Sequence, residues 1–438
     1  MQSLPPDPWP APLASRPVTA QIAMPGSKSA TNRALVLAAL ANGPSRIIGA
    51  LDARDTSLMI DALTALGAII TATSGLVDGT LDCHVTPATA PGDSTLTIDV
   101  GLAGTVMRFV PPMAALSRAK VTFDGDERAR ERPLGPMLDA MKYLGITVTD
   151  ADGHLPVTID GTGRIAGGDV RIDASASSQF VSGLLLSAAR FDSGLKLTHI
   201  GAHLPSQPHI DMTIEMLAEH GVTVHRSGSS EHPTWHIEAG PIAAIDRLIE
   251  PDLSNAAPFL VAGLITGGRI RIPDWPEHTT QAGDRLRDLL AQMGAHVERD
   301  PGGLTLSGPD EVRGLVANLH DVGELAPVIA AAAALASTPS HLTGIGHLRG
   351  HETDRLAALA EMITELGGEV EFGDDDLRIT PRPLHGGTVS SYGDHRMATA
   401  AAVLGLRTPD VWIRDIATTR KTLLDFPGMW TDMLEQRA

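Results

Sequence analysis

The stretch GSKSATNRALVLAALANGPSRIIGA, residues 26–50, runs from a small polar loop through an Ala- and Leu-rich helix into a β-branched run. The same order recurs five more times, with polar openings near residues 101, 174, 252, 321 and 393. Five of the six openings are followed by a second amphipathic helix, a Gly and a further β-branched run, which is the order of a helix C-cap and a strand. A recurrence at roughly 70 to 80 residues indicates structural repeats. The pattern predicts six strand–helix–strand–helix–strand–strand units.

Six repeats divide into two groups of three, so we expect the chain of 438 residues to form an α/β protein of two domains. The boundary between the halves is expected at 247–251, just before the fourth opening. The Pro-rich leader, residues 1–24, is assigned to neither half by the pattern alone.

The composition argues against several classes of function. A formal net charge of −18 and an aromatic content of 3% are atypical of nucleic-acid binders, which use basic fields and stacking rings. The single cysteine, Cys83, rules out an internal disulfide and is expected to be a buried strand residue in a reducing compartment. The leader lacks the apolar segment of a signal peptide, and no apolar run is long enough to cross a bilayer. We therefore expect a soluble, cytoplasmic protein without nucleic-acid or membrane partners.

The polar openings are candidates for anion binding, because helix amino-termini carry unpaired N–H groups and a partial positive charge. In the first opening, Lys28 and Arg33 are expected to reach one bound anion. A Walker loop is excluded because Ser27 separates Gly26 from Lys28, where that loop requires Gly-Lys. Further cations in similar settings, suited to gripping phosphates and carboxylates, are Arg108, Arg132, Arg355, Arg396 and Lys421. Seven cations suit two multiply charged substrates.

Seven motifs carry a resemblance to a known family. In chain order, between Pro25 and Pro427, they are PGSKSATNRAL, GLAGTVMRF, RERPLGP, SASSQFVSGLLL, RGHETDRL, GDHRMA and KTLLDFP. Together they resemble the 5-enolpyruvylshikimate-3-phosphate synthase family. The resemblance implies a two-domain inside-out α/β barrel with three βαβαββ units in each domain. The domains would be 25–248 and, with the leader, 1–24 plus 249–438, with the active site in the interdomain cleft.

The resemblance also implies a reaction. The enolpyruvyl group of phosphoenolpyruvate would move to the 5-hydroxyl of shikimate 3-phosphate through a tetrahedral intermediate, with release of phosphate. The activity would be that of a 3-phosphoshikimate 1-carboxyvinyltransferase in the shikimate pathway, which leads to chorismate and the aromatic amino acids. Such an enzyme would be a cytoplasmic monomer, would need no metal or organic cofactor, and would be inhibited by glyphosate.

By motif position, the resemblance assigns three groups of residues. The proton-transfer groups would be Glu324, Glu352 and Lys28. Shikimate 3-phosphate would be bound by Lys28, Ser29, Arg33, Ser177, Ser178, Gln179, Ser206, Glu324 and His351. Phosphoenolpyruvate would be bound by Lys28, Gly104, Arg132, Gln179, Arg355, Arg396 and Lys421.

Some positions depart from the common pattern of that family. Many members have Asp where Glu324 stands and Lys where His351 stands, so the second contact is expected to be sensitive to pH in this chain. Tyr, Asn and Pro are common at the positions of His209, Leu102 and Phe109.

Two other functions stay open. A UDP-N-acetylglucosamine enolpyruvyl transferase shares the fold but typically carries a reactive Cys in a loop of the first half, and Cys83 lies in a different context. A non-catalytic anion-binding repeat protein would show the same periodicity, but would not require Glu324 and Glu352 beside the cations. A zinc site at His347 and His351 is disfavoured, because it lacks a third ligand and a regular helix.

Overall fold

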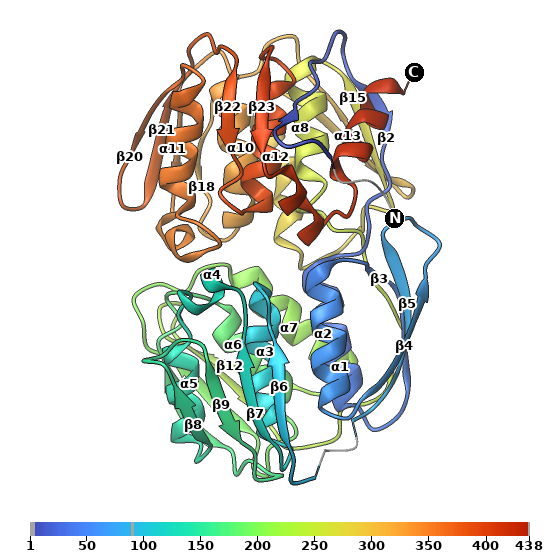
Figure 1. Ribbon diagram of the computed structural model, residues 1–438, viewed down its shortest axis with the longest axis vertical. Helices are drawn as coiled ribbons and strands as arrows, with labels where there is room; N and C mark the ends of the chain where they lie inside the picture. Colours follow the sequence, from blue (N-terminus) through green and yellow to red (C-terminus); the bar gives the residue numbers. More distant parts are fainter. Residues whose placement is uncertain (1–4, 89–91, 437–438) are drawn as a thin grey trace. The chain divides into compact units, whose positions relative to one another are not determined.

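The computed structural model describes residues 5–88 and 92–436. The chain forms two compact units (Figure 1). The inserted unit is Gly26–Ile249, and the terminal unit combines Met1–Pro25 with Glu250–Ala438. The domain boundaries expected at 24/25 and 248/249 lie one residue from these junctions, and we keep them as our proposal for the domains.

The inserted unit contains three four-stranded sheets with one common topology. In each sheet the first two strands are parallel and an antiparallel hairpin completes the sheet. A helical crossover joins the parallel strands of the second and third sheets, whereas β14, which pairs with β3 in the first sheet, comes from the end of the unit. The first sheet, with its helices, contains β14 (Arg247–Leu248), β3 (Ser45–Leu51), β5 (Thr80–Thr86), β4 (Ile69–Ser74), α1 (Lys28–Leu40) and α2 (Arg54–Ala65). The second contains β6 (Thr95–Asp99), β7 (Lys120–Asp124), β9 (Val157–Asp160), β8 (Thr147–Asp150), α3 (Gly104–Ala114), α4 (Glu127–Arg130) and α5 (Gly135–Tyr143). The third contains β10 (Gly168–Ile172), β11 (Leu195–His199), β13 (Pro233–Ile237), β12 (Val224–Gly228), α6 (Gln179–Ala188) and α7 (Gln207–Glu219).

The terminal unit repeats this topology with one change. Its first sheet and helices are β2 (Thr19–Gln21), β15 (Arg269–Pro273), β17 (Gly303–Ser307), β16 (His296–Asp300), α8 (Ala257–Thr266), the 3-10 helix η1 (Ala282–Arg285) and α9 (Leu286–Gln292). The second set is β18 (Val316–Asn318), β19 (Ser340–Thr343), β21 (Asp376–Thr380), β20 (Glu369–Phe372), η2 (Gly323–Leu325), α10 (Ala326–Ala334), η3 (Gly346–Gly350) and α11 (Arg355–Glu365). The third set is β22 (Gly387–Ser390), β23 (Val411–Arg414), β1 (Trp9–Pro10), α12 (His395–Gly405), η4 (Ile416–Lys421) and α13 (Phe426–Glu435).

The sixth repeat corrects the prediction of six equal units. Where the other repeats continue into a hairpin, the described chain after η4 forms α13, which buries Phe426, Trp430 and Met433. The third strand of this sheet is β1 from the leader, antiparallel to β23 with Trp9 opposite Ile413. Sequence periodicity could not show this, because the strand and its partner lie at opposite ends of the chain.

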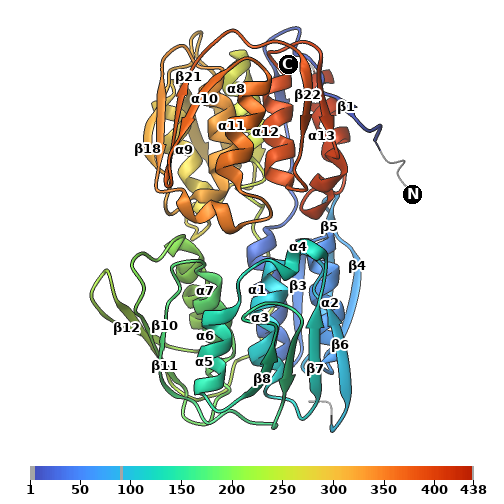
Figure 2. The ribbon, with the colours of Figure 1, turned by 60° about the vertical axis from the view of Figure 1, so that its left-hand side comes forward.

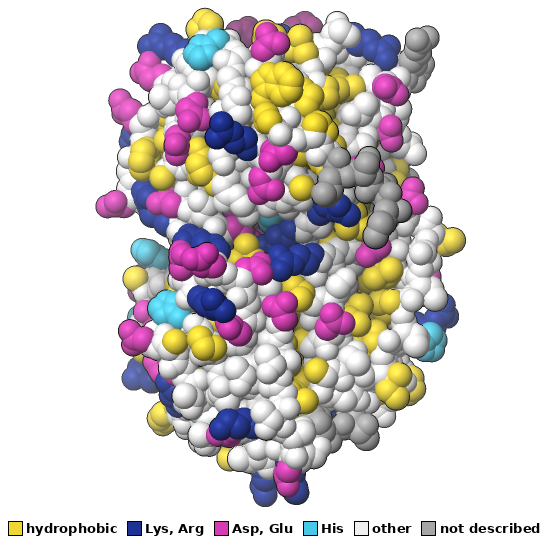
Figure 3. Space-filling model, viewed as in Figure 1, with side chains coloured by type: hydrophobic (Ala, Val, Ile, Leu, Met, Phe, Trp, Pro, Cys, Tyr) yellow, Lys and Arg dark blue, Asp and Glu magenta, His cyan; other side chains and the backbone are white. Residues whose placement is uncertain are grey.

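The helices form the interior of each unit, and the sheets form its outer wall. Helices α1, α3 and α6 pack on one another and are buried almost throughout, as are α8, α10 and α12 in the terminal unit (Figure 2). A helix that is apolar on every side is buried on every side. The hairpin edge strands face solvent, and acidic and basic side chains are interspersed over the outer face of each unit (Figure 3). This is the predicted inside-out α/β arrangement.

Five glycines confirm the predicted helix ends. Each follows a second helix and has a φ between 78° and 108°; they are Gly67, Gly145, Gly221, Gly294 and Gly367. The left-handed region strongly favours Gly, because other residues bring Cβ too close to a carbonyl oxygen. The repeated Gly in the sequence is therefore a geometric requirement of the helix-to-strand turn.

A further glycine tests the packing of the central helices. A Cβ at Gly183 in α6 would stand 2.1 Å from the carbonyl oxygen of Arg108 in α3. We expect Gly183→Ala to destabilise the protein by about 1–3 kcal/mol and to lower the Tm by roughly 2–12 °C in thermal denaturation. Gly240→Ala, where nothing lies within 4 Å of the new Cβ, is the matched control and should leave the Tm unchanged. Equal Tm values for both variants would contradict the close contact of α3 and α6.

Candidate active site

Three of the residues singled out in the sequence are the first residues of the central helices in the inserted unit. Lys28 begins α1, Gly104 begins α3 and Gln179 begins α6. The first turns are adjacent, because Asn32 Nδ2 donates to Thr105 Oγ1 at 2.6 Å and a Cβ at Gly104 would lie 3.1 Å from Gln179 Oε1. The residues directly before α3 and α6 do not cap these helices with their side chains. The first N–H groups of α3 can therefore bind an anion, whereas the first N–H of α6, that of Gln179, already donates to Ser177 Oγ.

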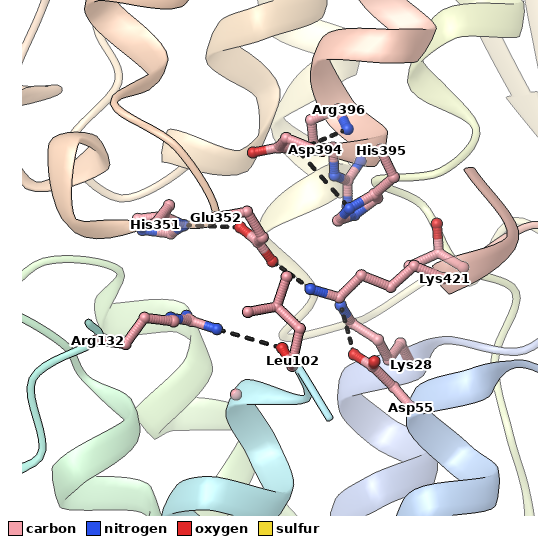
Figure 4. A network of polar contacts seen from close by, with 12 residues as sticks. Lys28, Asp55, Leu102, Arg132, His351, Glu352, Asp394, His395, Arg396 and Lys421 are labelled. Atoms are coloured by element: carbon pink, nitrogen blue, oxygen red, sulfur yellow. Dashed lines mark hydrogen bonds and ion pairs between the residues drawn. The ribbon is translucent and has the colours of Figure 1, made fainter. Parts of the chain in front are cut away.

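Lys28 is anchored by a carboxylate that the sequence analysis missed. Its Nζ lies 3.5 Å from Oδ2 of Asp55, which is buried in the first turn of α2 (Figure 4). The Lys28 side chain is 20% exposed, so the ammonium group has both a buried partner and access to solvent. Ser27 caps α1 by accepting a hydrogen bond from the backbone of Ala30. The signal for Asp55 was weak, since no motif places α2 against the start of α1.

Arg33 lies inside the unit rather than at an open surface. Its Nε donates to Thr213 Oγ1 at 2.8 Å, and its terminal nitrogens donate to the carbonyl oxygens of Ser29 and His209, both at 2.9 Å. Only 1% of Arg33 is exposed, and burial lowers its pKa to about 9. Arg33 therefore ties α1 to α7, and the expectation that it and Lys28 reach one anion stays a prediction.

Gly104 lies among three polar side chains. A Cβ at this position would stand 3.1 Å from Nη1 of Arg108 and 3.2 Å from Nη2 of Arg132. Arg108 is buried and donates to the carbonyl oxygen of Gly104 at 3.3 Å, while Arg132 donates to that of Leu102 at 3.4 Å. Oε1 of Gln179 and Nε of Arg132 are buried without a hydrogen-bond partner in the described part of the chain. The absence of a side chain at Gly104 therefore lets these polar groups lie close to the start of α3. Two of their atoms, Gln179 Oε1 and Arg132 Nε, can still form hydrogen bonds.

The serines singled out in the sequence lie at the starts of α6 and α7. Ser177 Oγ accepts a hydrogen bond from the backbone of Gln179 at 3.3 Å, and buried Ser178 directly precedes α6. Ser206 precedes α7 with a φ of 55° and a ψ of 46°. The left-handed region is uncommon for a residue with a side chain and is concentrated at functional sites.

Glu324 lies at the start of a central helix of the terminal unit, as Lys28 and Gln179 do in the inserted unit. It lies in η2, which leads directly into α10. Its Oε1 accepts a hydrogen bond from Ser254 Oγ at 3.2 Å, and the carbonyl oxygen of Ser254 accepts one from Arg396 Nη1 at 2.7 Å. Ser254 lies just before α8, and Arg396 is in the first turn of α12. The starts of all three central helices are therefore linked in this unit as well.

Glu352 lies between two cations. One carboxylate oxygen forms an ion pair with Lys421 Nζ, and the other lies 3.2 Å from Arg355 Nη2 and 3.9 Å from His351 Nδ1 (Figure 4). Only 8% of Glu352 is exposed. Such an arrangement favours a carboxylate and holds its two oxygens in fixed directions.

Asp394 is the second functional residue that the sequence analysis missed. It is fully buried, and its Oδ2 accepts a hydrogen bond from Arg355 Nε at 2.7 Å while its Oδ1 caps α12 by accepting from the backbone of Arg396 at 2.8 Å. Burial lowers the pKa of Arg355, but Asp394 and Glu352 more than offset this, so that its pKa is raised. For Arg396, burial lowers the pKa by more than the nearby carboxylates raise it. The motif GDHRMA contained a signal for Asp394, because Asp is a favoured N-cap residue.

Cys83 is confirmed as a buried residue of β5, and burial raises the pKa of its thiol to about 11. A thiol held in its protonated form is a poor nucleophile.

Within residues 5–88 and 92–436, no group of three His, Cys, Asp or Glu side chains could hold a metal ion. In the same part of the chain, a search for helices both long and apolar enough to span a membrane finds none.

The fold is shared with solved enolpyruvyl transferases. The EPSP synthase of Acinetobacter baumannii is similar with a TM-score of 0.78, covering 96% of this chain and 97% of that one at 22% identity. The enolpyruvyl transferase NikO of Streptomyces tendae is similar with a TM-score of 0.73, covering 96% of both chains at 18% identity. At these identities, the likeness establishes the class of fold.

The sequence comparisons define the family within this class. The family model of EPSP synthase (3-phosphoshikimate 1-carboxyvinyltransferase) matches residues 13–430. A 3-phosphoshikimate 1-carboxyvinyltransferase of Kocuria rhizophila is 52% identical over 433 residues, which cover 98% of this chain and 97% of that protein. This chain therefore belongs to the EPSP synthase family.

The pair of Arg355 and Asp394 yields a prediction about stability. Asp394→Asn would leave the buried guanidinium of Arg355 without its full counter-charge, so we expect a loss of about 3–5 kcal/mol in the free energy of unfolding, measured by urea denaturation. Asp300→Asn removes the partner of Arg271 in an exposed ion pair and should change the urea midpoint much less. If both variants lost stability equally, the buried pair would not be a structural anchor.

Proposed function

We propose that this chain transfers the enolpyruvyl group of phosphoenolpyruvate to the 5-hydroxyl of shikimate 3-phosphate, with release of phosphate, in aromatic amino acid biosynthesis. The observation that carries the proposal is the combination, in each unit, of three linked helix starts with the cations and acids singled out in the sequence. Membership of the EPSP synthase family supports the same activity. The serines at the start of α6 favour an acceptor that carries a phosphate group.

We assign the shikimate 3-phosphate contacts mainly to the inserted unit. Ser177 and Ser178 lie at the start of α6, where their hydroxyl groups and the neighbouring N–H groups can surround a phosphate group. Lys28, anchored by Asp55, supplies a point charge. The remaining proposed contacts are Ser29, Arg33, Gln179, Ser206, Glu324 and His351.

We assign phosphoenolpyruvate to two groups of residues. Arg132 and the start of α3 at Gly104 would bind its phosphate, because a guanidinium and free N–H groups lie together there. Arg355 and Arg396 would clamp its carboxylate. Asp394 orients the guanidinium of Arg355, and the carbonyl oxygen of Ser254 orients that of Arg396. Lys28, Gln179 and Lys421 complete the proposed set.

The proposed chemistry is an addition followed by an elimination. The 5-hydroxyl oxygen loses its proton and bonds to C2 of phosphoenolpyruvate, while C3 gains a proton and becomes a methyl group. The bond from C2 to the phosphate oxygen then breaks, and C3 returns a proton, so that the enolpyruvyl ether and phosphate are released. Glu324, Glu352 and Lys28 are the groups proposed to hold and move these protons, and such groups typically contribute about 10²- to 10⁴-fold to a rate.

A phosphate-release assay tests the proposed function. Phosphate should appear only when both phosphoenolpyruvate and shikimate 3-phosphate are present. UDP-N-acetylglucosamine in place of shikimate 3-phosphate is the decisive comparison, because the fold also occurs in other enolpyruvyl transferases. Turnover with the nucleotide sugar instead of shikimate 3-phosphate would overturn the proposal.

Lys28 is expected to be essential for turnover. Lys28→Ala should lower kcat by about 10²- to 10⁴-fold, because it removes both a substrate contact and a proton-transfer group. The double variant Lys28→Ala/Asp55→Asn, which leaves no unpaired buried carboxylate, should be equally inactive yet fold normally by circular dichroism. Lys196→Ala, in an exposed pair with Asp169, is the control. Turnover by Lys28→Ala near the level of that control would remove the assigned role.

Shikimate 3-phosphate is expected to stabilise the protein. At a ligand concentration of about 100 times the Kd, binding adds about 2.7 kcal/mol to the free energy of unfolding and should raise the Tm by several degrees. Shikimate without its phosphate should have a much smaller effect, because it cannot use the start of α6. Equal shifts with both compounds would contradict the placement of the phosphate at Ser177 and Ser178.

We further propose that the chain acts as a cytoplasmic monomer and is inhibited by glyphosate in competition with phosphoenolpyruvate. A single buried thiol suits a reducing compartment. Sedimentation of the protein and turnover at rising glyphosate concentrations are the direct measurements.

A further inference from the structure

Three histidine rings lie in a row in the terminal unit. The ring centroid of His347 is 5.9 Å from that of His320 and 6.0 Å from that of His351, and both neighbours meet it edge-on, at interplanar angles of 68° and 63°. His320 belongs to the turn before η2, His347 to η3, and His351 directly follows η3. The row is not a metal centre, because no metal-holding group of three such side chains exists among the described residues.

The middle ring packs directly on the backbone beside a proposed catalytic acid. A Cβ at Gly323 would stand 2.6 Å from His347 Nε2 and 3.1 Å from its Cε1, so the ring lies where a larger residue at position 323 would clash with it. Gly323 begins η2 and immediately precedes Glu324. His347 Nε2 is itself buried and has no hydrogen-bond partner within the described chain. A shift of the His347 ring would therefore change the contact with Gly323, which is bonded directly to Glu324.

The surroundings keep His347 neutral. Burial lowers its pKa to about 4, and the neighbouring His320 and Arg355 act in the same direction, against Glu324 and Asp375. The pKa of His320 is raised by its hydrogen bond with Asp321. Near neutral pH, His347 is therefore uncharged.

We propose that His347 is a positioning residue, which holds Glu324 and His351 in the places from which they act on shikimate 3-phosphate. The inference rests on the proposed function, which supplies the roles of these two residues. His347 acts through its contacts with Gly323 and with the ring of His351, and not on the reacting atoms. Charged or titratable groups around it are His320, Asp321, Glu324, His351, Glu352, Arg355 and Asp375.

The test compares kcat and KM in variants at His347. His347→Ala should lower kcat by up to roughly 100-fold, the loss expected when a catalytic group moves by about 1 Å, and should raise the KM for shikimate 3-phosphate. The KM for phosphoenolpyruvate should change much less, because Asp394 holds the guanidinium of Arg355 and the backbone carbonyl of Ser254 holds that of Arg396. His347→Gln, with a neutral planar end, should recover most of kcat, whereas His347→Lys, with a charge at similar length, should not.

Gly323 provides an independent test from the other side of the contact. Gly323→Ala places a methyl group against the His347 ring and should reproduce the kinetic pattern of His347→Ala. In the double variant the clash is absent, so the two effects should be clearly less than additive. Gly350→Ala is the matched control, since nothing lies within 4 Å of its new Cβ.

Two results would overturn the inference. The first applies when the wild type is active and circular dichroism shows that His347→Ala and Gly323→Ala are folded. Wild-type kinetic constants in both variants, or effects that are additive in the double variant, would then overturn the inference. If His347→Ala does not fold, equal kcat values for His347→Gln and His347→Lys overturn the inference in its place. The second is a wild type without phosphate release from the two substrates, which overturns the proposed function and this inference with it.

Discussion

Both units depend on one constraint, which is that the amino-terminal ends of three buried helices meet within each of them. In four of the six sheets a central helix joins two parallel strands, and in the other two the parallel pairs are β14 with β3 and β2 with β15, each central helix leading into the second strand. The central helices therefore run in the same direction relative to their sheets. Three copies around one interior bring their starts together, as the bond from Asn32 to Thr105 and the link from Arg396 through Ser254 to Glu324 show. The topology thus gathers the partial positive charges and the N–H groups of the helix starts, and our proposal for anion binding rests on this arrangement.

The charges buried at these helix starts are balanced inside each unit. Lys28 lies beside Asp55, Lys421 beside Glu352, and Arg355 beside Asp394. An unpaired buried charge costs several kcal/mol, so these carboxylates stabilise the buried cations in place.

The sequence allowed prediction of the features that depend on local chemistry and repetition. The glycines at helix ends and the order of polar opening, helix and strand followed from short-range pattern, and the inside-out layering followed from the family resemblance. Long-range contacts did not: β1 in the sixth sheet, Asp55 beside Lys28 and the packing of His347 on Gly323 each join segments that no motif relates. The contacts of Arg33 with α7 are a further example, because Thr213 and His209 lie far from it in the chain.

The most direct test of this account is a crystal structure of the protein with shikimate 3-phosphate. The account predicts that the phosphate group lies within hydrogen-bond distance of Ser177 and Ser178, at the start of α6, with Lys28 Nζ close to the ligand. A ligand bound elsewhere, or bound here with its phosphate directed away from that helix start, would contradict the claim that the converging helix amino-termini form the anion site.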